Sequence, residues 1–375
     1  MKSFLLNAVL FVIVLLISLE LLFRTLIPAS NVAYKALDKQ YGILLHDTTG
    51  ERDGQYTTGR LLMDRVHWRI NNWGWRSDKE YLPPSPSRKP VIALIGDSYI
   101  AGFQVNSRDH FGSVLEDKLG HRYDVYNFGS GGTPASQAVY TARYARDHFD
   151  PDIYIFLVRD PTWKNSIANY DRDPKVRQLR WDNGRFTETL PSFTSGALLR
   201  WRKRSALIRY LVYNADLDLT GGVTNAVHHV NLPSDAPPPK DYLDAYPLIR
   251  PAMDHLIGQL RADLPGKKIL FLSNVYVENI YDNRPQQSQG TLECLREVCN
   301  RYQIPVLDLA PAFASDWNAH RIPLTFEIDY HWNARGHSVV ADTLADFLIG
   351  NHWTDEKRAD ALTTALTDRS HEDSH

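Results

Sequence analysis

Residues 91–98 read Val-Ile-Ala-Leu-Ile-Gly-Asp-Ser, and this stretch decides the fold of the chain. An apolar run of this length that ends at a glycine is typical of a buried strand in a parallel sheet, because helices cover both faces of such a strand. Asp97 and Ser98 follow the run directly. In open α/β sheets, functional groups gather outside the carboxyl ends of the strands. The stretch therefore predicts a parallel sheet and one edge of a functional site.

The same alternation continues along the chain. Further strands are expected over 123–127, 153–158, 269–272 and 305–309, and helices over 108–119, 133–148, 242–261, 291–302 and 334–348. Repeated strand–helix units imply a parallel sheet with helices on both faces, which is a three-layer α/β sandwich. The alternation lapses from about 163 to 240, where only 203–213 has a helical pattern. We therefore expect a helical insertion there, over one end of the sheet.

These patterns divide the chain into four regions. An N-terminal apolar segment covers 1–30, an irregular extension 31–90, the α/β domain 91–350 with its insertion at about 163–240, and a polar tail 351–375. The extension is polar and aromatic, and its proline-rich stretch at 81–87 cannot form a helix or a central strand. This stretch is therefore expected to be a linker that precedes the sheet.

The N-terminal segment has the composition of a membrane anchor. Phe4–Phe23 is apolar except for three residues, of which Glu20 lies near the end. A helix needs about 20 mostly apolar residues to cross a bilayer. Lys2 and the free amine precede the stretch and only Arg24 follows it, a slight charge bias that favours the N-terminus in the cytoplasm. We therefore predict a single-pass signal-anchor helix, with the rest of the chain outside the cytoplasm, in the periplasm.

Two other interpretations of this segment stay open. A cleaved signal peptide is expected to have small residues three apart at its cleavage site, and residues 27–29 and 31–33 fit that pattern poorly. A buried helix of a soluble protein is rarely apolar on every side at the extreme terminus. Both the anchor and the cleaved peptide place the rest of the chain in an exported compartment.

The composition limits the function classes. The chain has 375 residues, with 42 Lys and Arg against 44 Asp and Glu and a formal net charge of −2. Nucleic-acid binding needs a basic surplus or stripe, so no nucleic-acid partner is expected. Cys294 and Cys299 are too few for a disulfide scaffold and show no zinc-type spacing. On a continuous helix they are too far apart to pair, so a disulfide between them requires the helix to bend or end between them.

Two glycine-containing loops follow predicted strands. Gly96-Asp97-Ser98 can point a serine into solvent with backbone N–H groups nearby, although the same tripeptide is ordinary turn chemistry. Residues 127–134, Asn-Phe-Gly-Ser-Gly-Gly-Thr-Pro, run into a helix. They can bind phosphate at the helix N-terminus, donate a glycine N–H to an oxyanion, or form only a tight turn. They match neither the P-loop nor the full dinucleotide-binding pattern.

A third segment, 326–337, supplies a candidate base just before the last helix. Histidine titrates near neutrality, and a carboxylate such as Asp329 can fix the tautomer of His331 and stabilise its charged form. With Ser98 as nucleophile, the order along the chain is Ser, Asp, His. A metal site built from Asp329, His331 and His337 is the alternative, but no other cluster of ligand residues in the sequence supports it.

Together these segments resemble the SGNH (GDSL) hydrolases, a superfamily of serine esterases and acyltransferases on a flavodoxin-like α/β sheet. Residues 95–99, Ile-Gly-Asp-Ser-Tyr, are similar to the family's first block, which implies that Ser98 is the nucleophile. Residues 127–134 resemble the second block. The resemblance implies that the backbone N–H of Gly132, with that of Ser98, forms the oxyanion hole.

The last family block resembles residues 329–333, Asp-Tyr-His-Trp-Asn. It implies that Asp329 and His331 complete the catalytic triad. Residues 71–76, Asn-Asn-Trp-Gly-Trp-Arg, look like those of the anchored, exported members, which also carry a helical insertion after the third strand. The resemblance therefore extends from about residue 71 to residue 348.

One block departs from the family pattern. The third strand is followed by Arg159-Asp160, where the family has an asparagine that completes the oxyanion hole. Arg159 can donate in its place, bind an anionic part of the substrate, or form a salt bridge with Asp160 or another carboxylate. Asn165 is another candidate donor. Candidate substrate contacts are Asp97, Asp160, Asn165 and Trp332, although Trp332 is also expected to pack behind the catalytic loop.

The resemblance implies a membrane-anchored serine esterase that acts on an acyl or acetyl ester outside the cytoplasm and needs no cofactor or metal. Its substrate is then an ester-bearing small molecule or glycan. Two alternatives stay open: a carbohydrate O-acetyltransferase that uses the same triad beside a membrane-bound acyltransferase partner, and a non-catalytic SGNH-like binding module. Acceptor competition separates hydrolysis from transfer, and covalent labelling of the serine separates an enzyme from a binding module.

Overall fold

The computed structural model describes most of the chain, and some sequence predictions fall outside it. The described residues are 2–27, 29–31, 33–57, 59, 65–192, 204–215, 217, 242–286, 289–327 and 330–354. Asp329, residues 193–203 and 218–241 of the insertion, and the tail from residue 355 lie outside the described residues.

Five parallel strands form the central sheet and confirm the predicted α/β fold. They are β5 (Val91–Gly96), β6 (Asp124–Gly129), β7 (Ile153–Val158), β10 (Lys268–Ser273) and β11 (Val306–Asp308). Their spatial order is β11-β10-β7-β5-β6, which is the flavodoxin-like order. The order reverses at β5 and β7. In sheets of this kind, ligands bind in the crevice outside the carboxyl ends of those two strands.

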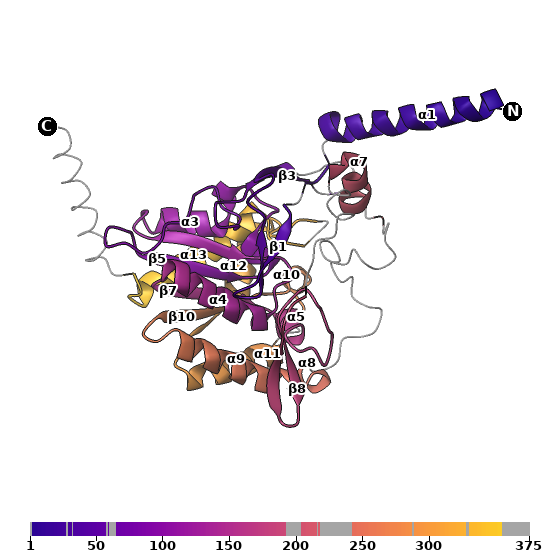
Figure 1. The fold of residues 1–375 in the computed structure, drawn as a ribbon. Helices are drawn as coiled ribbons and strands as arrows, with labels where there is room; N and C mark the ends of the chain where they lie inside the picture. The colour runs from indigo at the N-terminus through magenta and orange to yellow at the C-terminus, as the bar shows by residue number, and fades with distance from the viewer. Residues whose placement is uncertain are drawn as a thin grey trace.

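Helices cover both faces of this sheet (Figure 1). One face carries α4 (Ala135–Phe149), α9 (Ile249–Asp263) and α11 (Gln289–Arg301), and the other carries α3 (Phe111–Lys118), α12 (Ala310–His320) and α13 (Ala334–Gly350). The central strand β5 packs against the helices on both faces. Ala93 and Ile95 are buried against α4, α9 and α11, and Ile92 and Leu94 are buried on the face of α3, α12 and α13. A strand buried on both faces must be apolar throughout, which is the pattern that its sequence carries.

Short helices complete the described fold, and the sequence analysis misses several of them. They are α2 (Ser98–Ala101), η2 (Ser107–Asp109), α5 (Asp160–Lys164), α7 (Ala206–Arg209), η3 (Tyr210–Asn214), α8 (Tyr242–Ala245) and α10 (Val277–Tyr281). Residues 242–261, predicted as one helix, are divided between α8 and α9 because Pro247 interrupts the pattern. Helix α12 escapes prediction because it is rich in alanine and only Phe313 of it is buried, so no apolar stripe marks it.

Two regions predicted as irregular or helical contain β-hairpins instead. The extension holds β1 (Lys35–Asp38) paired with β2 (Ile43–His46) and β3 (Asp53–Thr57) paired with β4 (Arg65–Arg69), and the insertion holds β8 (Gln178–Asp182) paired with β9 (Arg185–Thr189). Asn183 and Gly184 form the last turn, with φ of 48° and 79°, the left-handed conformation typical of Asn-Gly hairpins. The prediction of a helical insertion is therefore wrong for residues 178–189, although the sequence contains the Asn-Gly pair that signals a hairpin turn.

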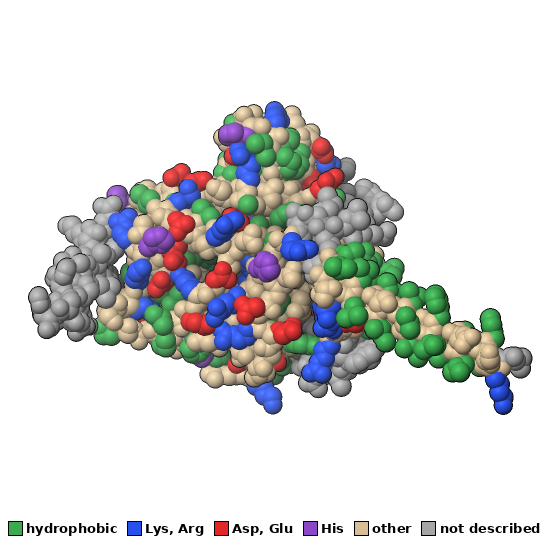
Figure 2. Space-filling model, turned by 90° about the horizontal axis from the view of Figure 1, so that it is seen from above, with side chains coloured by type: hydrophobic (Ala, Val, Ile, Leu, Met, Phe, Trp, Pro, Cys, Tyr) green, Lys and Arg blue, Asp and Glu red, His purple; other side chains and the backbone are tan. Residues whose placement is uncertain are grey.

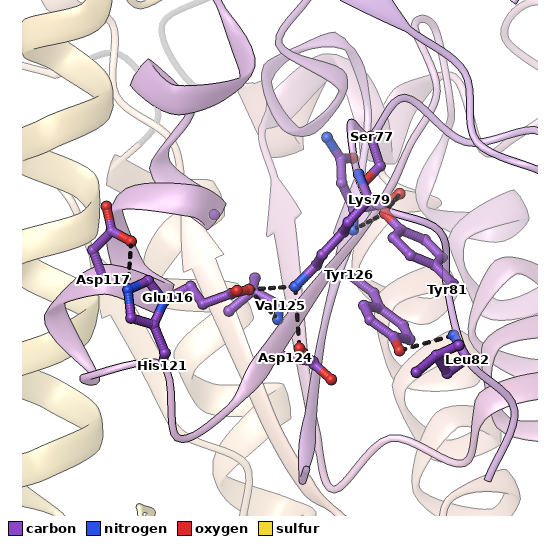
Figure 3. A network of polar contacts seen from close by, with 12 residues as sticks. Ser77, Lys79, Tyr81, Leu82, Glu116, Asp117, His121, Asp124, Val125 and Tyr126 are labelled. Atoms are coloured by element: carbon purple, nitrogen blue, oxygen red, sulfur yellow. Dashed lines mark hydrogen bonds and ion pairs between the residues drawn. The ribbon is translucent and has the colours of Figure 1, made fainter. Parts of the chain in front are cut away.

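Residues 77–82 of the extension cover the edge strand β6 (Figure 3). Lys79 forms an ion pair with Glu116 on α3. Glu116 also accepts the backbone N–H of Val125 at 2.9 Å. Farther along β6, the Tyr81 hydroxyl donates to the carbonyl of Asn127 and accepts its N–H, at 3.1 and 2.6 Å. These contacts satisfy backbone groups that an edge strand otherwise leaves unpaired.

The N-terminal segment forms a helix that is long and apolar enough to cross a membrane. Helix α1 (Lys2–Leu21) and the wider turn η1 (Leu22–Leu26) give 25 residues, and an 18-residue stretch within them has a mean hydropathy of 2.7. Figure 2 shows their apolar side chains exposed along a rod that projects from the body of the molecule. By length and composition, this segment fits the predicted anchor.

The end of this helix is joined to the body of the protein through Glu20. Its carboxylate accepts hydrogen bonds from the backbone N–H groups of the first two residues of α7, at 2.9 and 3.0 Å, and from the Ser205 hydroxyl at 2.8 Å. Glu20 therefore caps α7 from a distant segment of the chain. The ring of Phe23 also stacks on Tyr210 of η3, with ring centroids 3.9 Å apart.

Replacing Glu20 by alanine is expected to lower the free energy of unfolding by about 1–2 kcal/mol, because the backbone N–H groups of Ala206 and Leu207 then lose their acceptor and only the Ser205 cap of α7 remains. The measurement is urea unfolding of the full chain in detergent micelles. Asp346→Ala is the control, since Asp346 is an exposed carboxylate on α13 that makes no hydrogen bond with another described residue. Equal stabilities of the two variants would contradict the capping role of Glu20.

Candidate active site

Ser98 is the first residue of α2 and directly follows the turn at the carboxyl end of β5. Asp97 fixes this turn, since its Oδ1 accepts the backbone N–H of Tyr99 at 3.1 Å. The turn also packs closely on β6: a Cβ on Gly129 would lie 2.2 Å from the backbone nitrogen of Ala101. Only glycine fits at such an approach. The half-buried Ser98 side chain therefore has a defined position at the edge of the sheet.

His331 lies on the loop between α12 and α13. This loop folds back on itself, because Thr325 pairs with Trp332 in an antiparallel bridge. The backbone N–H of Phe326 donates to the carbonyl of His331 at 2.8 Å. At the end of the loop, Asn333 Oδ1 accepts a backbone N–H from the first turn of α13 at 3.1 Å. Contacts on both sides therefore hold the imidazole-bearing segment in place.

These two segments bring Ser98 and His331 into contact. Ser98 Oγ and His331 Nε2 are 2.8 Å apart, a hydrogen bond in which the hydroxyl donates when the imidazole carries its proton on Nδ1. The Tyr99 ring lies beside the imidazole, with ring centroids 4.6 Å apart. A base within hydrogen-bond reach of a hydroxyl is the arrangement that activates serine as a nucleophile. Asp329, the predicted third member, lies outside the described residues.

Arg159 forms a largely buried ion pair with Asp97. Its Nε donates to Asp97 Oδ2 at 2.7 Å, and the Asp97 side chain is only 2% exposed. Burial opposes the charge of Arg159, but the Asp97 carboxylate more than offsets this effect and raises the pKa of Arg159. Of the roles expected for Arg159, the structure shows a salt bridge, with Asp97 rather than Asp160 as its partner. Asp97 is therefore buried and paired instead of open to substrate.

The glycine-rich loop after β6 lies beside Ser98. A Cβ built on Gly131 would be 3.8 Å from the Cβ of Ser98. Gly132 is exposed and has a φ of 79°, which favours glycine. Among the described residues no group accepts the Gly132 N–H, whereas the next N–H, of Thr133, donates to the carbonyl of Ser130 at 3.1 Å. The Gly132 N–H is therefore available to a ligand, which the predicted oxyanion hole requires.

A small pocket lies between the carboxyl ends of β7 and β10, and the sequence analysis names only Arg159 and Asp160 of its lining. Its polar lining includes Arg159, Asp160, Asn274, Tyr276 and Thr291. Burial raises the pKa of Asp160 to about 6, and the Tyr276 hydroxyl donates to its Oδ2 at 3.3 Å. Asn274 directly follows β10, as the Asp97-Ser98 pair follows β5, so the signal for this pocket is present in the sequence.

Of the three other candidate residues, Trp332 and His337 are buried and Asn165 is exposed. Asn165 is exposed at the C-terminal end of α5, and its side-chain amide makes no hydrogen bond with another described residue. Trp332 is 1% exposed and packs in the core against Tyr99, so it is not open to substrate. His337 is buried, and its Nδ1 accepts the N–H of Phe111 at 3.2 Å. Burial lowers the pKa of His337 well below its usual value, so this side chain is neutral.

Metal and disulfide chemistry have little structural support in the described residues. No group of three His, Cys, Asp or Glu side chains is placed there to hold a metal ion, and Asp329 of the alternative metal set lies outside them. Cys294 and Cys299 are buried and free on the continuous helix α11, which agrees with their spacing.

Comparison with known proteins finds several solved esterase structures among the matches, all at low identity and low TM-score. No protein-family model and no curated protein matches the sequence. A two-domain esterase active on acetylated mannans is 13% identical over 70% of this chain and 49% of that one, with a TM-score of 0.39. A carbohydrate acetylesterase from Sinorhizobium meliloti is 11% identical over 70% of this chain and 99% of its own, with a TM-score of 0.37. The M. smegmatis aryl esterase is 12% identical over the same shares, with a TM-score of 0.37. At identities and TM-scores this low, no role of these proteins is carried over to the chain.

Asp160 is expected to make the stability of the protein depend on pH. Its pKa is about 6 in the folded state and close to 4 in the unfolded chain, so the folded state binds more protons between these values. Stability therefore falls as pH rises through this window, by about 3 kcal/mol in total. Asp160→Asn removes the titration and should gain about that much relative to the wild type between pH 4 and pH 7.

Denaturant unfolding of both proteins at several pH values measures this difference. Asp346→Asn is the matched control, because it alters an exposed carboxylate on α13. A difference between Asp160→Asn and the wild type that stays constant from pH 4 to pH 7 would show that folding does not raise the pKa of Asp160.

Proposed function

We propose that the chain is a serine ester hydrolase of the SGNH type, with Ser98 as nucleophile and His331 as general base. The observation that carries this proposal is the 2.8 Å contact between Ser98 Oγ and His331 Nε2. The unpaired N–H of Gly132, in a loop beside Ser98, supports it further. Asp329, two residues before His331, is proposed to hold the imidazole in the required tautomer.

In this mechanism, His331 Nε2 takes the proton of Ser98 Oγ as the oxygen attacks the ester carbonyl. The backbone N–H groups of Ser98 and Gly132 stabilise the oxyanion that develops on the carbonyl oxygen. The tetrahedral intermediate collapses, and the leaving alkoxide takes the proton from the imidazolium. His331 then removes a proton from water, which attacks the acyl-enzyme and releases the acid while Ser98 recovers its proton.

The proposed enzyme is anchored in a membrane by α1 and η1, with the catalytic domain on the extracytoplasmic side. The length and hydropathy of the helix support the anchor. The bonds from Glu20 to α7 support a permanent attachment, because a cleaved signal peptide has no structural role in the mature body. The slight excess of positive charge before the helix, from Lys2 and the free amine against Arg24 after it, supports the orientation.

Ser98→Ala is expected to lower kcat on p-nitrophenyl acetate at least about 10³-fold, because no other group can form the acyl-enzyme. Ser85→Ala, a change at an exposed loop serine, is the control and should keep full activity. Thermal unfolding of each variant checks that the fold is intact. A fluorophosphonate should label the wild type at Ser98, forming an Oγ–P bond and releasing fluoride. Full activity of Ser98→Ala would refute the mechanism, and an unlabelled wild-type serine would favour a binding module.

Arg159 stands where the SGNH family has an asparagine that donates to the oxyanion. We propose that the terminal nitrogens of Arg159 donate to the oxyanion instead, since its Nε already donates to Asp97. Arg159→Met leaves the Asp97 carboxylate buried without a counter-charge, which should cost about 3 kcal/mol of stability. The double variant Asp97→Asn, Arg159→Met removes that charge and should recover most of this stability.

The double variant separates a catalytic donor from a structural partner. If Arg159 stabilises the oxyanion, kcat of the double variant stays about 100-fold below that of Asp97→Asn even though the fold has recovered. Steady-state kinetics on p-nitrophenyl acetate measures this ratio. If the double variant recovers kcat as well as stability, Arg159 acts only as the ion-pair partner of Asp97 and does not stabilise the oxyanion.

A further inference from the structure

The short helix that begins with Ser98 is held at its far end by His110. Helix α2 has only four residues, and isolated helices shorter than about 12 residues are marginal in water. The carbonyls at the end of a helix lie beyond the reach of its own N–H groups. Here His110 Nε2 lies 2.8 Å from the carbonyl oxygen of Ile100, and both residues are buried. The imidazole therefore supplies a partner that α2 cannot provide for itself.

The other ring nitrogen of His110 caps α3. The backbone N–H of Gly112 donates to His110 Nδ1 at 3.0 Å. Because a backbone N–H only donates and a carbonyl only accepts, Nδ1 carries no proton and Nε2 carries one. Burial, together with the charge of Arg76, lowers the pKa of His110 to about 3, which agrees with this neutral form. One neutral imidazole thus connects the end of α2 with the start of α3.

A second imidazole reaches the same end of α3 from the segment that carries the base. His337, in the first turn of α13, accepts the N–H of Phe111 at 3.2 Å. Its ring packs edge-on against Trp332, the neighbour of His331, with ring centroids 5.7 Å apart. Figure 1 shows α3 and α13 side by side. The start of α3 therefore supports both the segment that carries Ser98 and the segment that carries His331.

The backbone around His110 leaves the imidazole little space to move. Gly102, at the end of α2, has a φ of 58°, and a Cβ there would lie 2.4 Å from His110 Cδ2. A Cβ on Gly112 would lie 3.1 Å from His110 Nδ1. Glycine allows this close approach on both sides of the ring. The imidazole is therefore enclosed, and its bond to Ile100 fixes the end of α2.

We propose that His110 is a positioning residue of the active site: through the carbonyl of Ile100 it holds α2 so that Ser98 Oγ stays in contact with His331 Nε2. The inference rests on the proposed esterase mechanism, because it concerns the contact that activates Ser98. His110 is buried and acts through α2 rather than on the substrate. A misplacement of about 1 Å at such a contact can lower the rate about 100-fold.

Two substitutions separate the roles of the two ring nitrogens. In His110→Asn, the amide oxygen takes the place of Nδ1 and still caps α3, but no donor reaches Ile100. In His110→Gln, the amide nitrogen takes the place of Nε2 and donates to Ile100, whereas Gly112 loses its acceptor. Steady-state kinetics of the full-length proteins on p-nitrophenyl acetate, in detergent micelles, measures kcat and KM.

His110→Asn is expected to lower kcat at least about tenfold with little change in KM, because α2 loses its support while the substrate surface is unchanged. His110→Gln should keep most of the wild-type kcat, although the lost cap lowers its melting temperature. The rate at which a fluorophosphonate labels Ser98 should fall in His110→Asn and not in His110→Gln. His255→Asn, at a half-buried histidine of α9 on the opposite face of the sheet, is the control and should leave kcat unchanged.

Thermal unfolding of each variant shows whether it is folded at the assay temperature. His110→Ser repeats the test if the asparagine variant does not fold, because serine also caps helices well and is too short to reach Ile100. A fall in kcat without a matching fall in melting temperature in either variant supports the positioning role, since a merely structural residue would change both together.

Two results would overturn the proposal. One is a wild-type kcat in folded His110→Asn or His110→Ser. The other is a kcat that follows the melting temperature across the variants, which would limit His110 to stabilising the fold. Failure of the esterase mechanism has a different signature, since the wild type would then show neither ester turnover nor labelling of Ser98. The two failures are therefore distinguishable.

Discussion

The ion pair between Asp97 and Arg159 is the contact on which the candidate site depends. A carboxylate that is 2% exposed is costly to bury unless a cation compensates it. The same carboxylate holds the backbone N–H of Tyr99 and so shapes the turn that presents Ser98. Its partner follows β7, the neighbouring strand, so the pair forms only when β5 and β7 are aligned. The position of the nucleophile is therefore tied to the assembly of the sheet.

The sheet could be predicted from sequence because its strands are buried on both faces and must be apolar throughout. The hairpins follow a weaker local rule, and only the Asn183-Gly184 turn carries a clear signal. Helix α12 carries none, because its few buried residues leave no periodic stripe. Its position matters nonetheless, since the loop that follows it carries His331. The functional surroundings were thus harder to predict than the core.

The candidate site, like the fold, could be predicted from sequence only in part. Ser98 and His331 could be chosen from sequence, because a serine at a strand end and a histidine before the last helix have a chemical reason to meet. The partner of Arg159 could not be chosen, because Asp97, Asp160 and other carboxylates were all within reach in sequence terms. Asp97 and Asp160 are equally buried, and only the folded geometry places Arg159 Nε 2.7 Å from Asp97. Asn274 and Tyr276 were overlooked although they follow β10 at the same edge of the sheet. Applying the strand-end rule to every strand would have found them.

Glu20 extends this reasoning to the membrane. A carboxylate in an apolar helix is unfavourable for insertion unless it lies near an interface or finds donors. Here Arg24 forms an ion pair with the carboxylate at 2.5 Å, and the first two backbone N–H groups of α7 donate to it, so the anchor and the start of α7 satisfy each other. If α1 spans a bilayer, this exchange requires α7 to lie at the membrane surface, and the rest of the domain is then held at a fixed distance from it. An anchor attached in this way positions the catalytic domain as well as retaining it.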